Sequence, residues 1–445
     1  MSALTKEQFG SDFKWGVSAA AYQIEGANDM YGKGPSIWDV FANTKGKISA
    51  GQNANITCDF YNRYIYDLIL MRGMNIRNFR FSIAWSRIFP EGMGRINRAG
   101  KDFYNRVIDF CLELGIEPWI TLYHWDLPQT LETKGGWTNR EIIDWFSDYI
   151  SFCIKAYGDR VNHWMILNEP MVFTGAGYFL GLHAPGKKGL ANFLPAVHHA
   201  ALAQAEGGRI IRSVKTDAII GTTFSCSYIE PHAFTESDQA AANKMDVLLN
   251  RMFLEPLLGL SYPFKDLKLL NRITPYMRQD DEAKLAFDMD FIGIQNYTRE
   301  IVRHTPFVPY VYAKIIKADK RNVEKTVMGW EVYPESIYYM LQKFSSYKQI
   351  KNIIITENGA AFPDEVIDGK VKDEKRKVFI KNNLKQIFKA KSEGINVTGY
   401  FIWTFTDNFE WAEGYKPRFG LVHVNFRNQK RIVKSSGHWY RQFLT

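Results

Sequence analysis

The sequence has little that would support disulfide bonding or structural zinc. Its 445 residues include only four cysteines, and no two of them form a C-x-x-C pair or take the spacing of a zinc site. Cys111 and Cys153 fall within apolar helical patterns, which predicts that they are thiols of the core.

Long hydrophobic runs and basic blocks are also missing. The longest apolar stretches are far shorter than the roughly 20 residues that cross a bilayer, and residues 1–12 contain no apolar segment typical of a signal peptide. The formal charge of +9 is spread along the chain, and no nucleic-acid-binding module is present. We therefore expect a cytoplasmic protein with neither a membrane nor a nucleic acid as partner. Its oligomeric state does not follow from the sequence.

Low-complexity segments, long Gly/Ser linkers and shifts of composition are absent too, which predicts one domain over residues 1–445. What recurs is a unit of a short apolar strand, a polar and aromatic loop, and an amphipathic helix. Eight strands are predicted at residues 14–20, 78–83, 117–122, 161–167, 218–223, 291–294, 352–356 and 397–404. Alternating strands and helices predict a parallel sheet, and eight repeats favour an α/β fold closed as a single (β/α)8 TIM barrel. An open doubly wound sheet is less favoured, because no Gly-rich phosphate-binding motif follows the first strand.

Helical patterns lie between these strands, with apolar residues at three-to-four spacing. They are predicted at residues 60–72, 101–114, 139–157, 193–214, 237–258, 334–347 and 374–393. We expect Asp59 to cap the first of these helices and Gly115 to follow the end of the second.

Polar and aromatic motifs occur at the ends of seven of the eight predicted strands. Active sites of such barrels lie at the carboxyl ends of the strands, so these side chains are expected to converge on one rim. In chain order, the candidates are Gln23, Arg80, His124, Asn168, Glu169, Tyr297, Glu357, Trp403, Glu410 and Trp411.

Glu169 and Glu357 are the two acids that suggest a reaction. They stand in Asn-Glu-Pro and Glu-Asn-Gly, at the ends of strands four and seven, which lie across the barrel mouth from each other. Two facing carboxyl groups are the apparatus of glycoside hydrolysis. A separation of about 5–5.5 Å gives a retaining enzyme and one of roughly 6.5–9.5 Å an inverting one, which the sequence does not decide.

The surroundings of each acid are expected to set its role. A nucleophile must stay ionised, so Arg80 is the candidate cation beside Glu357, and Tyr297 is a candidate hydrogen-bond donor to it. A proton donor must keep its proton near neutral pH, so Glu169 is expected to be desolvated and close to the charge of Glu357.

Other side chains at the rim suit the recognition of a sugar. Glu410 can accept hydrogen bonds from two neighbouring hydroxyl groups, because a carboxylate accepts at both oxygens. Further donors and acceptors come from Gln23, His124, Asn168 and Trp411, and an aromatic platform from Trp403.

Each motif alone has a plainer interpretation. Asn-Glu-Pro is common where a helix starts, Glu-Asn-Gly is common in turns, and single His or Trp residues usually serve the core. Only the coincidence of these motifs at one rim favours an active site. His198 and His199 are adjacent within a helix and are predicted to be structural.

Together these motifs resemble glycoside hydrolase family 1, the retaining β-glucosidase family. The similarity runs from Phe13-Lys14-Trp15-Gly16 to His438-Trp439-Tyr440. It includes the motifs at residues 21–26, 79–82, 124–128, 168–170, 356–359 and 407–411. The resemblance implies that Glu169 is the acid/base and that Glu357 is the nucleophile, through a covalent glycosyl-enzyme.

The resemblance also implies the positions of the sugar and of the leaving group. It places Trp403 beneath the non-reducing sugar and Trp330 on the aglycone side. The side chains that it implies around that sugar are Gln23, His124, Asn168, Glu410 and Trp411.

One motif departs from the family pattern. Where the family usually has Gly-(Ile/Val)-Asn-Tyr-Tyr, residues 293–297 read Gly-Ile-Gln-Asn-Tyr. Gln295 replaces the Asn that helps hold the nucleophile, so Glu357 is expected to sit slightly differently. Tyr297 retains the second Tyr, and we expect activity to survive.

The leading hypothesis is a retaining exo-β-glycosidase for small-molecule β-glucosides or oligosaccharides, with β-galactosidase or β-fucosidase side activity and no metal or organic cofactor. A sugar-binding protein without activity is disfavoured, because both Glu169 and Glu357 are present. A 6-phospho-β-glycosidase is disfavoured because Glu413 lies close to Glu410, and two acids repel a dianionic phosphate.

A transglycosidase, which passes the same intermediate to an acceptor sugar, stays an alternative. The aglycone side would decide it, but residue types alone do not. The residues concerned are Met171, Phe173, His183 and Trp330.

Overall fold

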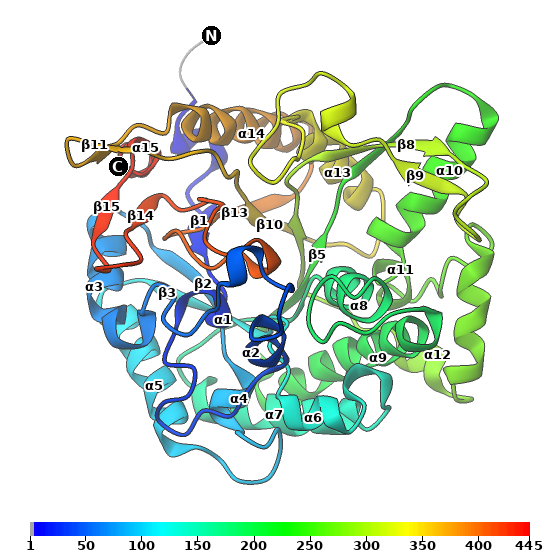
Figure 1. The fold of residues 1–445 in the computed structure, drawn as a ribbon, viewed down its shortest axis with the longest axis horizontal. Coiled ribbons are helices and arrows are strands. Elements are labelled where there is room, and N and C mark those ends of the chain that lie inside the picture. Colours follow the sequence, from blue (N-terminus) through cyan, green and yellow to red (C-terminus); the bar gives the residue numbers. More distant parts are fainter. Residues whose placement is uncertain (1–3) are drawn as a thin grey trace.

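Eight parallel strands form a closed barrel at the centre of the molecule (Figure 1). The computed structural model describes residues 4–445, and the strands follow one another around the barrel in the order β1-β13-β10-β7-β5-β4-β3-β2. Their bounds are β1 (Lys14–Ser18), β2 (Asn78–Ser82), β3 (Glu117–Tyr123), β4 (His163–Asn168), β5 (Ile219–Ser225), β7 (Phe291–Gln295), β10 (Ile353–Asn358) and β13 (Val397–Trp403). The TIM barrel expected from the sequence is confirmed, and each strand begins and ends within two residues of its predicted position.

Large side chains fill the interior of this barrel. Trp119, Met165, Phe291, Ile354 and Phe401 come from five different strands and form one buried cluster. Barrel strands are covered by helices outside and by such side chains inside, which explains why their sequences are almost continuously apolar.

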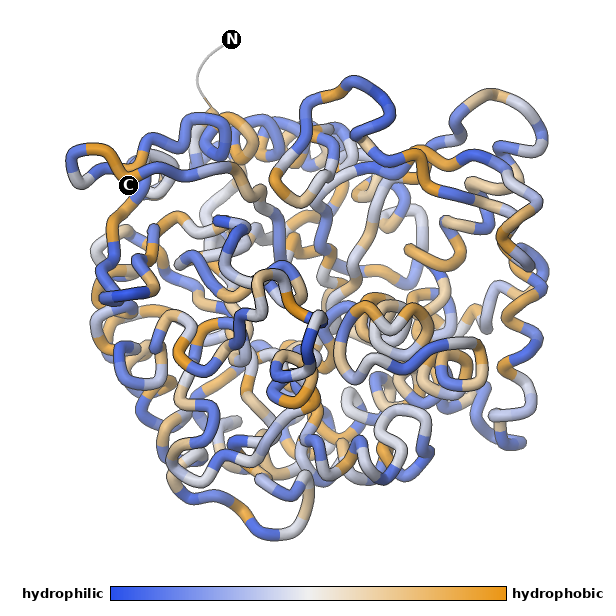
Figure 2. The backbone as a smooth tube through the Cα atoms, in the orientation of Figure 1, coloured by the Kyte–Doolittle hydropathy of each residue, from blue (hydrophilic) through white to orange (hydrophobic). Residues whose placement is uncertain are grey.

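Helices surround the barrel in the order expected from the alternating pattern (Figure 1). The longer ones are α3 (Phe60–Gly73), α5 (Arg98–Glu113), α7 (Ile142–Tyr157), α9 (Leu190–Val214), α10 (Glu236–Asp246), α13 (Glu335–Ser345), α14 (Glu374–Ser392) and α15 (Ser435–Phe443). Shorter helices are α1 (Ala21–Ile24), α2 (Ile37–Ala42), α4 (Trp85–Ile88), α6 (Gln129–Thr133), α8 (Pro170–Thr174), α11 (Leu254–Leu257) and α12 (Asp281–Lys284). Hydrophobic and hydrophilic residues alternate along the outer helices (Figure 2), as expected where one face meets the barrel and the other meets water. None of the helices within residues 4–445 combines the length and the apolar character needed to cross a membrane.

Two expectations about the helices are wrong. Asp59 precedes α3 but does not cap it, because its carboxylate accepts hydrogen bonds from the side chains of Asn62 and Arg63 instead. The single helix expected over residues 237–258 is divided into α10, a π-helical turn (Val247–Arg251) and α11. Pro256 accounts for the break immediately before α11, since it has no amide hydrogen to donate to the carbonyl group of Met252.

Other expectations about single residues hold. Gly115 follows α5 with a φ of 63°, the left-handed conformation that ends many helices. Cys111 and Cys153 are fully buried free thiols, as predicted.

A small second sheet extends the barrel beyond β5 and β7. Its strands are β6 (Tyr228–Pro231), β8 (Arg299–His304) and β9 (Ala313–Ile315), with β8 parallel to β6 and antiparallel to β9. Helix α10 covers it through an apolar cluster that includes Ala241, Ala242 and Val302. Two further hairpins pair β11 (Val366–Ile367) with β12 (Lys370–Val371) and β14 (Val422–Val424) with β15 (Arg431–Val433).

A buried charge cluster ties the C-terminal part of the chain to the loop that follows β13. The Nζ atom of Lys434 is buried and lies 2.5 Å from Asp364 and 2.6 Å from Asp407. Asp407 also accepts a hydrogen bond from Arg418 at 3.2 Å and from the backbone N–H of Gly420 at 3.0 Å. Burial alone would raise the pKa of Asp407, but the Lys434 ammonium, together with the charges of Arg418 and Arg376, holds it well below its usual range.

Lys434→Met should lower the free energy of unfolding by about 3–5 kcal/mol, because it leaves two carboxylates buried without their shared cation. Lys351→Met is the matched control. Its Nζ lies 2.5 Å from Asp288, but both side chains are more than half exposed, so we expect about 0–1 kcal/mol. Urea denaturation followed by circular dichroism measures both values. Equal losses in the two variants would contradict a special contribution of the buried cluster.

Candidate active site

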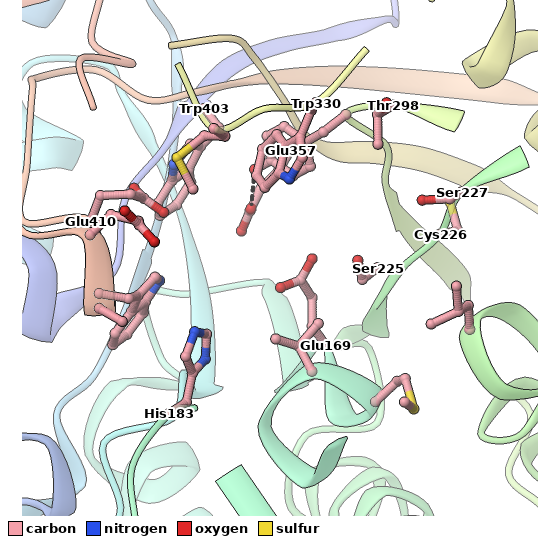
Figure 3. A pocket seen from close by; sticks show the side chains of 18 of the residues that line it. Glu169, His183, Ser225, Cys226, Ser227, Thr298, Trp330, Glu357, Trp403 and Glu410 are labelled. Atoms are coloured by element: carbon pink, nitrogen blue, oxygen red, sulfur yellow. Dashed lines mark hydrogen bonds between the residues drawn. The ribbon is translucent and has the colours of Figure 1, made fainter. Parts of the chain in front are cut away.

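A cavity of about 350 Å³ lies at the carboxyl ends of the barrel strands (Figure 3). Seven of the ten side chains expected at the rim line it, together with Trp330 from the aglycone side, namely His124, Glu169, Tyr297, Trp330, Glu357, Trp403, Glu410 and Trp411. The other three lie directly behind them. Arg80 and Asn168 are buried beneath the floor, and Gln23 contacts Glu410. All eleven candidates therefore belong to one connected site.

Glu357, near the end of β10, is held by two charge-assisted hydrogen bonds. Arg80 Nη1 donates to its Oε1 at 2.5 Å, and the Tyr297 hydroxyl donates to its Oε2 at 2.6 Å. Burial raises the pKa of Glu357, while the Arg80 charge and both hydrogen bonds oppose the rise. These partners favour the ionised carboxylate relative to an equally buried acid that lacks them.

Glu169 stands at the turn between β4 and α8. Its φ is 47°, and Pro170 begins the helix immediately after it. Such left-handed positions are unusual for residues other than glycine and occur often at functional sites. The turn directs the carboxyl group of Glu169 into the cavity, where Figure 3 shows it facing that of Glu357.

The two acids differ in how strongly they hold a proton. Burial, followed by the negative charge of Glu357, raises the pKa of Glu169 well above its ordinary value. Glu357 has the closer cation and the Tyr297 donor, so its pKa is raised less. The pair therefore favours a protonated Glu169 beside an ionised Glu357.

Asn168 is fixed by donors from three other strands of the barrel, β2, β7 and β5. Its Oδ1 accepts hydrogen bonds from Arg80 at 2.5 Å, Gln295 at 2.8 Å and Thr223 at 2.9 Å. Its Nδ2 lies 2.9 Å from Nε2 of His124. The amide therefore has one orientation, with its donor side toward the cavity wall.

Gln295 supports Asn168 rather than the nucleophile candidate, contrary to expectation. Its Nε2 donates to Asn168 and, at 3.2 Å, to Thr223, while its Oε1 has no hydrogen-bond partner within residues 4–445. The extra methylene lets this side chain reach from β7 past β5 to the end of β4. Glu357 is seated by Arg80 and Tyr297 instead.

One end of the cavity offers polar atoms that lack partners. Gln23 Nε2 donates to Glu410 at 3.3 Å, but Gln23 Oε1 and His124 Nδ1 are buried without a hydrogen-bond partner among residues 4–445. Burial, and then the charge of Glu357, raises the pKa of Glu410 to about 8. Buried polar atoms are nearly always satisfied, so these groups suit a polar, hydroxyl-bearing ligand.

Aromatic rings border both ends of the cavity. At one end the His124 ring lies 5.9 Å from Trp403 and 5.8 Å from Trp411, measured between ring centroids. At the other end Trp330 lies 5.3 Å from Tyr297. Figure 3 shows Trp403 and Glu410 on one side of Glu357 and Trp330 on the other.

Several lining residues belong to no motif of the sequence. Ser225 is the last residue of β5 and Ser227 follows it, and Thr298 and Glu300 follow β7. Their position just beyond a barrel strand was the available signal. Phe173, expected on the aglycone side, instead packs in the core against Tyr123 and Trp137, each with a centroid distance of 5.1 Å.

The adjacent histidines of α9 are structural, as expected. His198 lies 2.8 Å from Asp281 and 3.1 Å from the Tyr262 hydroxyl. His199 Nδ1 lies 2.9 Å from the carbonyl oxygen of Trp137. Neither histidine lines the cavity.

The sequence model of glycosyl hydrolase family 1 matches residues 5–445. The chain belongs to this family. It is 43% identical over 436 residues to beta-glucosidase A of Thermotoga maritima, covering 98% of this chain and 97% of that protein. It is 42% identical to beta-glucosidase A of Acetivibrio thermocellus, over 99% of each protein.

Solved structures of family 1 share the same architecture. The family 1 β-glucosidase of Thermotoga maritima superposes with a TM-score of 0.93 at 41% identity, over 97% of each chain. The same enzyme in complex with deoxynojirimycin also gives a TM-score of 0.93, over 98% of each chain. The resemblance to family 1 and the (β/α)8 fold are thus confirmed.

Glu357→Gln should lower the pKa of Glu169, because it removes the charge that contributes most to the rise after burial. Burial persists, so the pKa should stay above its ordinary value. NMR titration of protein with 13C-labelled glutamate carboxyls measures the shift, with the Glu169 signal assigned by its loss in Glu169→Gln.

Glu413→Gln is the control for this experiment. Glu413 lines the same cavity but is not among the charges that raise the pKa of Glu169. An unchanged pKa of Glu169 in Glu357→Gln, or an equal fall in both variants, would contradict direct coupling of the two acids.

Proposed function

We propose that this member of family 1 is a retaining exo-β-glucosidase that hydrolyses terminal non-reducing β-D-glucosyl residues by double displacement. The observation that carries the proposal is a pair of facing buried carboxyl groups with opposite surroundings, Glu357 beside Arg80 and Glu169 beside the charge of Glu357. Relatives named beta-glucosidase A and 1,4-beta-D-glucan glucohydrolase, at 41–43% identity, support it.

In the first step, the Glu357 carboxylate attacks the anomeric carbon. Glu169 donates its proton to the glycosidic oxygen, so the bond to the leaving group breaks as the glycosyl-enzyme ester forms. Arg80 and Tyr297 hold Glu357 in place and favour its ionised form before the attack.

In the second step, water replaces the leaving group. Glu169, now ionised, takes a proton from this water, whose oxygen attacks the anomeric carbon and releases Glu357. Two inversions at one carbon leave the product with the β configuration of the substrate.

The end of the cavity around Glu410 is the proposed site of the terminal glucosyl unit. Glu410 would accept hydrogen bonds from two neighbouring hydroxyl groups, and Gln23 Oε1 and His124 Nδ1 would gain the partners that they lack. Asn168 and Trp411 would add donors, and Trp403 would lie against the apolar face of the ring. A β-fucoside or β-galactoside, which presents a similar ring, is the expected side substrate.

The charge of the cavity wall favours a sugar without phosphate. The lining, all within residues 4–445, contains no Lys or Arg, whereas Glu410 and Glu413 both belong to it. A dianionic phosphate would find no cation there to pair with. We therefore propose that 6-phospho-β-glucosides are poor substrates.

Glu357→Gln should abolish turnover of aryl β-glucosides, whereas the loss in Glu169→Ala should depend on the leaving group. Without its proton donor, the enzyme should hydrolyse phenyl β-glucoside about 10²–10⁴-fold more slowly. 2,4-Dinitrophenyl β-glucoside, whose leaving group needs little protonation, should lose far less in the first step. Steady-state kinetics on both substrates measures the contrast.

Two further readouts separate the roles of the acids. Azide needs no general base, so it should restore turnover of Glu169→Ala and yield β-glucosyl azide. In the wild type, NMR of the first product formed should show β-glucose. Equal losses on both aryl glucosides would exclude Glu169 as the acid, and a first product of α configuration would exclude retention.

A further inference from the structure

Glu300 is a carboxylate of the cavity wall that the proposed mechanism does not use. It is the second residue of β8, in the sheet that extends the barrel beyond β7. It lines the same cavity as Trp330 and Thr298, and its side chain is partly buried.

The cationic side chains near Glu300 form ion pairs with other acids. Arg299 donates to Glu230 at 2.7 Å and to Glu331 at 2.9 Å, and Arg321 donates to Glu331 at 2.6 Å. No hydrogen bond or ion pair within residues 4–445 engages the Glu300 carboxylate. Glu300 thus remains an acceptor in the cavity wall without a partner.

The geometry of β8 explains why Glu300 faces the cavity and Arg299 does not. Successive residues of a strand point to opposite faces of the sheet. Arg299 points to the face that carries Glu230 and Glu331, while Glu300 shares its face with Val302. Val302 lies in the apolar cluster under α10, and Glu300 stands closer to the barrel, where that cluster gives way to the cavity.

The wall around Glu300 combines groups that suit a second sugar. Trp330 offers an aromatic face, and Ser227 and Thr298 add small polar side chains. Figure 3 shows these three on the side of Glu357 that is away from Glu410, where the leaving group of a bound glucoside would lie. A carboxylate there can accept hydrogen bonds from two neighbouring hydroxyl groups.

We propose that Glu300 is a specificity-determining residue that accepts hydrogen bonds from the hydroxyl groups of a sugar leaving group, so that glucosyl-sugars are preferred to alkyl glucosides. This inference rests on the proposed β-glucosidase function, because it assigns the leaving-group end of the same cavity. Burial raises the pKa of Glu300 to about 7, with Arg321 opposing the rise and Glu331 adding to it. A substantial fraction of the side chain is therefore ionised at neutral pH.

The test compares cellobiose with hexyl β-D-glucoside. Both substrates release a poorly acidic alcohol and need the same proton donor, but only cellobiose carries hydroxyl groups on the leaving group. Glu300→Leu should reduce kcat/KM for cellobiose about 10- to 100-fold, the range for loss of hydrogen bonds to a charged group. It should change kcat/KM for hexyl β-D-glucoside less than about threefold. Glu300→Gln, which keeps one acceptor, should retain part of the cellobiose activity.

Glu230→Gln is the matched control, since Glu230 belongs to the same sheet but pairs with Arg299 and does not line the cavity. It should affect the two substrates equally. Parallel losses on both substrates in Glu300→Leu and Glu300→Gln, or no loss in either, would overturn the inference. So would a wild type that cleaves hexyl β-D-glucoside but not cellobiose. A wild type that cleaves neither these nor aryl β-glucosides would overturn the proposed function itself.

Discussion

The arrangement of the site depends on the hydrogen bonds that the buried guanidinium group of Arg80 donates. It donates to Glu357 at 2.5 Å, to Asn168 at 2.5 Å and to Thr121 at 3.1 Å, and so joins strands β2, β10, β4 and β3. A charge taken out of water is tolerated only when it is paired and hydrogen-bonded, so none of these partners can move independently. Arg80 thereby fixes the position of side chains from opposite walls of the barrel.

This constraint also creates the difference between the two acids. Arg80 and Tyr297 contact Glu357 directly, while Glu169 extends from the turn after β4 and, besides its burial, experiences the repulsion of the Glu357 charge. Similar burial thus produces two protonation preferences, which depend on partners rather than on depth. Asn168 links the surroundings of the two acids, because it precedes Glu169 in the chain and accepts a hydrogen bond from Arg80, which also donates to Glu357.

The barrel and most of the site could be predicted from the sequence, because both follow from local patterns. Strands buried on both faces are continuously apolar, and a polar residue at the end of such a strand is conspicuous. What escaped prediction depends on contacts between distant segments. The strands of the β6-β8-β9 sheet are short and do not belong to the alternating pattern of strands and helices. The carboxylate of Asp59 binds the side chains of Asn62 and Arg63 instead of capping α3. Gln295 donates a hydrogen bond to Asn168, which lies two strands away.

Because of the second sheet, the residues at the two ends of the cavity belong to different structural elements. Trp403 belongs to β13, and Glu410 belongs to the following loop, which Lys434 holds through its ion pair with Asp407. Glu300 belongs to the β6-β8-β9 sheet, which packs against α10. Substitutions in that sheet need not disturb the hydrogen-bond network around Arg80. Substitutions in the β6-β8-β9 sheet could therefore change which leaving group is accepted while the residues that cleave the glycosidic bond stay the same. Protein engineering could use the same separation of leaving-group recognition from bond cleavage.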